Sequence, residues 1–112
     1  MNNNESKSFE QFYLLTNIED FKFSIKNYLI EYTNSNHSDK YGLVFNILYN
    51  EMNDFINNIK IITENKIILK DNHIYIFKNY ELNLENIKDS YPEPVKNAFI
   101  NTINKFLKIQ NI

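Results

Sequence analysis

Side chains able to contact nucleic acid are concentrated between residues 53 and 78. Phe55, Ile59 and Ile62 lie four and three residues apart, which predicts a helix with one buried face. The opposite face would carry asparagines, whose amide can donate to and accept from adenine at once, while nearby lysines could bind phosphate. The candidate DNA-binding residues are Asn53, Asn57, Asn58, Lys60, Lys66, Lys70, Asn72 and Lys78.

Residues suited to catalysis or metal binding are scarce. His37 and His73 have no further ligands at metal-binding spacing, and Gly42, the single glycine, cannot build a phosphate-binding loop. Glu51 and Asp54 would share a helix face, but the helix dipole alone favours such an acidic first turn. The chain has no Cys and so no disulfide or thiolate chemistry. We therefore expect that the protein is not an enzyme and that it binds neither a cofactor nor a metal ion.

The segment after the candidate helix has the pattern of a tight hairpin. Asn65 can adopt the left-handed conformation that ends a helix. Two apolar runs, residues 66–70 and 73–77, flank Asp71 and Asn72, and both of these residue types tolerate the positive φ of a type I′ turn. The sequence therefore predicts a helix, a strand, a two-residue turn and a second strand.

The interval from Asp39 to Ile62 permits two interpretations. It could be one long helix, or it could break near Tyr49 and Asn50, with Asn50 capping the second helix. No Gly or Pro forces a break there. We favour two helices, with the break between residues 48 and 52 and the second helix ending near 65, because one long helix would leave the hairpin without support.

Capping patterns predict two helices before this interval. Ser8 and Gln11 fit a capping box for a short helix that ends near Leu15. Asn17 can cap a longer helix, which the polar run from residue 33 to residue 38 would end. The apolar stripe of this longer helix is Ile18, Phe21, Ile25, Tyr28, Leu29 and Tyr32.

A last helix is expected at about residues 93–110. Pro92 and Pro94 fit its first turn, and Ser90 could cap it. Its apolar surface is larger than one small domain should cover, so we expect it to mediate a homodimer. The candidate dimer interface is Phe99, Ile100, Ile103, Phe106 and Leu107.

Composition sets the broad class of the protein. With 112 residues and 43% hydrophobic content, we expect a disordered segment at 1–7 followed by a single domain at 8–112. No apolar run is long enough to span a membrane, and the first residues lack signal-peptide features, so we expect a cytoplasmic protein. The abundance of Asn, Ile and Lys fits an AT-rich genome, such as that of a phage or plasmid.

The order of elements from about residue 21 to residue 80 resembles winged helix-turn-helix DNA-binding proteins. The resemblance rests on the spacing of the helices, the two strands and the turn between them. It implies an α+β, mostly helical fold: a winged helix-turn-helix with extra N-terminal and C-terminal helices. It also implies sequence-specific DNA binding, either in transcription regulation or as the centromere-binding adaptor of a plasmid or phage partition system, with a partition NTPase as a further partner.

The lack of arginine bears on how such a protein would bind. Lysine is the only permanently charged cationic side chain in the chain, so affinity per monomer should be weak. A dimer on AT-rich or repeated sites could compensate through avidity.

A protein-binding inhibitor, such as an immunity or anti-defence protein, is the second class of function. The formal net charge is −2, and negative charge can mimic nucleic acid. The acidic residues after the hairpin would form its contact surface. They are Glu81, Glu85, Asp89 and Glu93.

Overall fold

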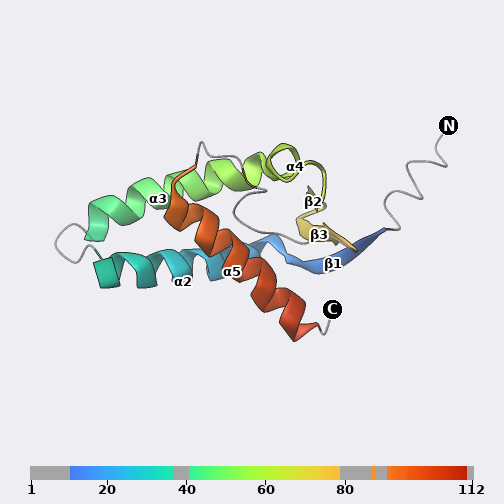
Figure 1. Cartoon of the computed structure of the whole chain (residues 1–112), viewed down its shortest axis with the longest axis horizontal. Coiled ribbons are helices and arrows are strands. Elements are labelled where there is room, and N and C mark those ends of the chain that lie inside the picture. The colour runs from blue at the N-terminus through green and yellow to red at the C-terminus, as the bar shows by residue number, and fades with distance from the viewer. Residues whose placement is uncertain (1–10, 37–40, 79–86, 88–90, 111–112) are drawn as a thin grey trace.

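The computed structural model describes residues 11–36, 41–78, 87 and 91–110, and it has an α+β fold that is mostly helical. This confirms the predicted α+β, mostly helical class. The elements in chain order are β1 (Phe12–Asn17), α2 (Ile18–Asn36), α3 (Tyr41–Asn57), α4 (Ile59–Ile62), β2 (Ile67–Lys70), β3 (His73–Phe77) and α5 (Glu93–Ile109) (Figure 1). The segment at 1–7 that we expected to be disordered lies outside the described residues.

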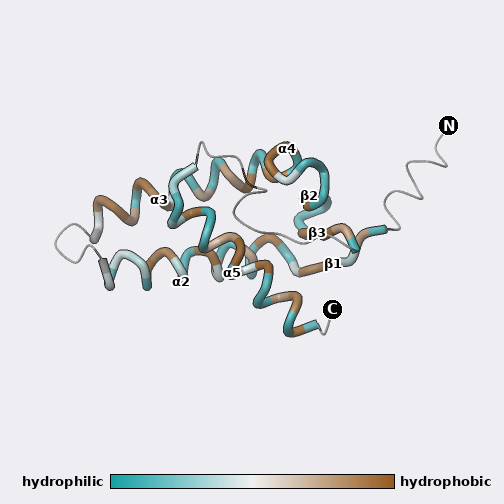
Figure 2. The backbone as a smooth tube through the Cα atoms, viewed as in Figure 1, coloured by the Kyte–Doolittle hydropathy of each residue, from teal (hydrophilic) through white to brown (hydrophobic). Residues whose placement is uncertain are grey.

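Three helices form the body of the molecule, and the sheet lies at one end of it (Figure 1). Helices α2 and α3 run side by side in opposite directions, and α5 packs across α2. Each of the three has an apolar side, which appears in Figure 2 as brown segments alternating with teal along the tube. The fully buried rings of Phe21, Phe55 and Phe99 meet where the three helices join, because each helix contributes one of them.

The sheet is antiparallel, with strand order β1-β3-β2. The predicted helix ending near Leu15 is wrong in its described part, since Phe12–Asn17 form strand β1. This strand pairs with β3 along its length, with Phe12 opposite Phe77 and an irregularity between Leu14 and Thr16. Pairing with a distant strand outweighs the local capping pattern here. The hairpin thereby gains a third strand.

Helix α3 runs without interruption through the position of the predicted break. The break between residues 48 and 52 is therefore wrong. The helix ends instead at Asn57, and the next residue, Asn58, has a φ of −109° and a ψ of 14°, which depart from helical geometry. Leu48, Met52 and Phe55 are all buried, so the apolar stripe continues across residues 49 and 50. The reason for expecting a break also disappears, because β1 supports the hairpin.

The predicted turns and the predicted cap at Asn17 are confirmed. Asn65 has a φ of 66°, and Asp71 and Asn72 have φ values of 53° and 63°, as a type I′ turn requires. The Oδ1 atom of Asn17 accepts a hydrogen bond from the backbone N–H of Asp20 at 2.8 Å, which caps α2.

Helix α5 occupies nearly the span expected for it, and Ser90, which was expected to cap it, lies outside the described residues. Pro92 holds the cap position, with a φ of −59° and a ψ of 145°, and makes no side-chain capping bond. A proline ring fixes φ and so can set the direction of the chain into the first helical turn. Pro94 lies within that turn, as expected.

Candidate nucleic-acid interface

A line of asparagines runs along the exposed side of α3. Asn46, Asn50, Asn53 and Asn57 are spaced four, three and four residues apart, which places them on one helical face. Asn53 is half-buried and the other three are exposed. At a rise of about 1.5 Å per residue, these amides extend over roughly 16 Å of helix. We call these four residues the asparagine stripe.

Sequence reasoning found only half of this stripe. Asn53 and Asn57 were expected at a DNA-binding face, whereas Asn50 was assigned to a cap and Asn46 was not considered. If residues 39–62 are interpreted as one helix, Asn46 and Asn50 fall on the same face as Asn53 and Asn57, because the four positions are spaced three or four residues apart.

The short helix α4 places the next two candidates differently. Lys60 is exposed and follows Asn57 at a spacing of three residues. The amide nitrogen of Asn58 donates to the backbone oxygen of Asp54 at 2.9 Å and lies 3.3 Å from its carboxylate. The Asn58 side chain therefore stabilises the boundary between α3 and α4 and is not part of the asparagine stripe.

The hairpin carries the remaining candidates. Lys70 and Lys78 are exposed, and Asn72 is exposed at the tip of the turn. Lys66 is half-buried, with its Nζ atom 4.1 Å from the centre of the Phe77 ring. From residue 60 to residue 78 there are four lysines and two carboxylates, so this segment carries a net positive charge.

Thr63 fixes the hairpin to the helices. Its side chain is fully buried, and its Oγ1 atom donates to the backbone oxygen of Ile59 at 2.6 Å. The same atom accepts a hydrogen bond from the backbone N–H of Ile67 at 3.1 Å. One hydroxyl thus links the last turn of α4 to the first residue of β2.

The candidate dimer residues on α5 divide into two groups. Phe99 and Ile103 are fully buried in the chain's own core and offer no surface to a second copy. Ile100, Phe106 and Leu107 are half-buried at the edge of that core. A contact between copies through this helix would therefore use the second group.

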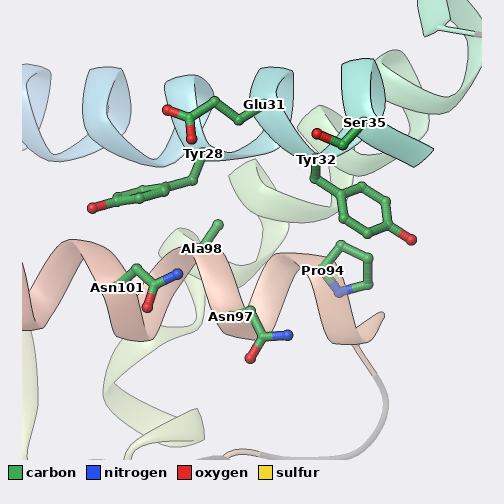
Figure 3. Close-up of a pocket in the computed structure, with 8 residues that line it drawn as sticks. All are labelled: Tyr28, Glu31, Tyr32, Ser35, Pro94, Asn97, Ala98 and Asn101. Carbon is green, nitrogen blue, oxygen red and sulfur yellow. The ribbon is translucent and has the colours of Figure 1, made fainter. Parts of the chain in front are cut away.

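A shallow pocket of about 280 Å³ lies between α2 and α5. Figure 3 shows the rings of Tyr28 and Tyr32 on one side and the amides of Asn97 and Asn101 on the other. Glu31 is the one charged residue among those that line it, so the pocket does not suit a phosphate. The lysines considered for phosphate contacts lie on α4 and the hairpin instead.

The described residues contain neither a cluster of ligands that could hold a metal ion nor a helix both long and apolar enough for a membrane span. Of the acidic residues considered for an inhibitor, Glu93 is exposed in the first turn of α5. The other three lie outside the described residues.

Asp54, one of the two carboxylates considered for catalysis, is occupied by structural contacts. Its Oδ2 atom accepts a hydrogen bond from the hydroxyl of Tyr91 at 2.7 Å, and the Tyr91 ring packs edge-on against Phe55 at 5.0 Å. Partial burial, the hydrogen bond and the charge of Asp54 together raise the pKa of Tyr91 to about 12. This contact ties the segment before α5 to α3.

Stability should depend on pH through Tyr91. Its pKa is raised from 10.0 to about 12, so the folded chain retains a phenolic proton that the unfolded chain loses near pH 10. The stabilisation is complete below pH 10 and is lost as pH rises toward 12. Urea denaturation from pH 8 to pH 11.5 should show wild type losing its advantage over Tyr91→Phe above about pH 10. A pH-independent difference between the two would contradict this assignment.

Comparison of the chain with protein-family models, curated proteins and solved structures finds no match.

Proposed function

We propose that this chain binds duplex DNA sequence-specifically, as a protein of the winged-helix type. The observation that carries the proposal is the asparagine stripe on one unbroken helix, which the short helix α4 connects to a lysine-bearing hairpin. In this arrangement α3 and α4 face the major groove, and the hairpin acts as the wing.

The geometry of α3 supports this role. The major groove is about 12 Å wide and admits one α-helix. An asparagine amide pairs with the N6 and N7 atoms of adenine, and the stripe presents such amides on successive turns. The recognition helix is then α3 itself, without the break that the sequence suggested.

The lysines supply the contacts that do not depend on sequence. Lys60, Lys66, Lys70 and Lys78 lie on α4 and the hairpin, where they would bind phosphates as point charges. Because no arginine adds bidentate contacts, affinity per monomer stays modest.

We also propose a cytoplasmic homodimer that contacts AT-rich or repeated sites, with Ile100, Phe106 and Leu107 of α5 at the interface. Two linked DNA-binding surfaces gain affinity through avidity. Such a dimer would serve either transcription regulation or the segregation of a plasmid or phage, in the second case with a partition NTPase as partner.

Substitution of the stripe tests the proposal. Asn53→Ala and Asn57→Ala should each weaken binding to duplex DNA from the protein's own locus by about 1–3 kcal/mol, which is roughly 5- to 150-fold. Non-specific binding should change little, because lysines supply it. Fluorescence anisotropy with labelled fragments measures both affinities.

Asn104→Ala is the matched control, since Asn104 is an exposed asparagine on α5, away from the stripe. It should bind DNA as wild type does. If fragments covering the locus fail to bind, or if the stripe variants bind them as wild type does, the proposal is wrong. Capture of a protein partner that Glu93→Lys abolishes would then favour an inhibitor.

A further inference from the structure

The three-stranded sheet has two chemically different faces. On one face Ile67, Ile74 and Ile76 are buried in the core. On the other, the middle strand β3 presents His73, Tyr75 and Phe77, all half-buried, because side chains alternate along a strand. None of the described helices covers this second face. We call it the open face.

The neighbouring strand β1 extends the apolar surface. Phe12 lies opposite Phe77, and their rings pack edge-on with centres 5.4 Å apart. Leu14 lies opposite Tyr75 and is 50% exposed, which is high for a leucine within a sheet. The open face is thus a broad surface of rings and aliphatic groups that still contacts solvent.

Positive charge borders these rings. Lys70 lies opposite His73 on the edge strand β2. The backbone oxygen of Lys66 accepts a hydrogen bond from the N–H of Phe77 at 2.8 Å, so Lys66 lies beside Phe77. Its ammonium sits over the Phe77 ring, 4.1 Å from the ring centre. Within the three strands and Lys66, no carboxylate shares this face.

We propose that the open face binds single-stranded DNA. Unpaired bases stack on Tyr75 and Phe77, and the phosphates between them contact Lys66 and Lys70. Stacking on aromatic rings combined with lysine contacts to phosphate is how sheet surfaces hold unpaired strands without reading their sequence. The positive charge of these lysines is complementary to the negative charge of a phosphate backbone.

Lys66 does not block a base from reaching Phe77. The contact is a single cation–π interaction between a half-buried lysine and a half-buried ring, and the stacking of a base on the ring is of comparable or greater strength, so an incoming base can displace the ammonium. The displaced ammonium remains beside the ring, where the adjoining phosphate lies. A duplex cannot use this face in the same way, because its bases are already stacked and paired.

The site is distinct from the asparagine stripe, so it goes beyond the proposed duplex binding. Duplex recognition assigns base contacts to α3, whereas the open face belongs to β1, β2 and β3. Lys66 and Lys70 are assigned phosphate contacts in both, so the two activities are separated by their base contacts and not by the lysines. Asn53→Ala should leave single-strand binding unchanged, and Tyr75→Leu should leave the base preference on duplex DNA unchanged.

Fluorescence anisotropy with the full chain and a labelled oligothymidine of about ten nucleotides tests the proposal. Phe77→Leu and Tyr75→Leu should each weaken binding by roughly 5- to 150-fold, the range found when a stacking ring is removed. Phe23→Leu removes a ring that is 63% exposed on α2 and should leave binding unchanged. Lys66→Ala should weaken binding, whereas Lys105→Ala, which removes a lysine 5.7 Å from the Phe106 ring centre, should not.

Leu14→Glu keeps the test decisive if a ring variant fails to fold. It places a carboxylate on an already exposed position of the open face and should weaken binding at an unchanged melting temperature. Wild-type affinity in folded Phe77→Leu and Leu14→Glu would overturn the proposal, as would a lack of binding to oligothymidine. Tighter binding of oligouridine than of oligothymidine would overturn the assignment to DNA.

Discussion

Replacing Phe99 by Ala should destabilise the protein by about 3–5 kcal/mol, the cost of removing a buried aromatic ring from a packed core. Phe99 is fully buried, and its ring centre lies 5.6 Å from that of Phe21 and 4.6 Å from that of Phe55. These three rings join α2, α3 and α5, so little nearby can move to fill the cavity. Urea denaturation followed by circular dichroism measures the change.

Phe23→Ala provides the control for this substitution. Phe23 is 63% exposed on α2, so its removal should change the free energy of unfolding by no more than about 0.5 kcal/mol. The effect of Phe99→Ala should also be independent of protein concentration, because the packing is internal. If Phe99→Ala dissociated a dimer without destabilising the folded monomer, the ring would belong to an interface between copies.

Features governed by a few neighbouring residues could be predicted from the sequence. The positive φ values of Asn65, Asp71 and Asn72 follow from side chains that tolerate the left-handed region. The cap at Asn17 follows from an amide oxygen placed to accept the N–H of Asp20. In each case the deciding interaction spans at most three residues.

Strand β1 could not be predicted in the same way. Phe12 pairs with Phe77, so the feature that selects a strand lies at the other end of the domain. Seen locally, the segment carries a plausible capping pattern and several aromatic residues, which suit a helix as well. Non-local pairing of this kind overrides local propensity.

The candidate site was partly found because the prediction of α3 was partly right. Reading the apolar stripe from Phe55 onward gave Asn53 and Asn57 on the opposite face, as the structure has them. Because the helix was predicted to break between residues 48 and 52, Asn46 and Asn50 were not assigned to this face. Asn58 was misassigned because its hydrogen bonds to Asp54 depend on where the helix ends.

Thr63→Val should cost about 1–3 kcal/mol of stability, although valine has nearly the same shape as threonine. The hydroxyl accepts the N–H of Ile67 in a fully buried position, and valine would leave that donor without this partner. The backbone oxygen of Ile59 is less affected, because it also accepts the backbone N–H of Thr63 at 3.0 Å. Urea denaturation gives the change, and amide exchange at Ile67 should become faster.

Thr63→Ser separates the hydrogen bonds of Thr63 from its packing. Serine keeps the hydroxyl and loses one methyl group, which costs roughly 0.8 kcal/mol. The serine variant should therefore be more stable than the valine variant, although valine preserves the shape better. The reverse order would mean that Thr63 acts through packing, and that the hairpin is held to α4 by the buried side chains of Ile62 and Ile67 rather than by the hydroxyl. Because the hairpin carries Lys66 and Lys70, the same order should recur in the affinity for duplex DNA if the rigid placement of the wing contributes to binding.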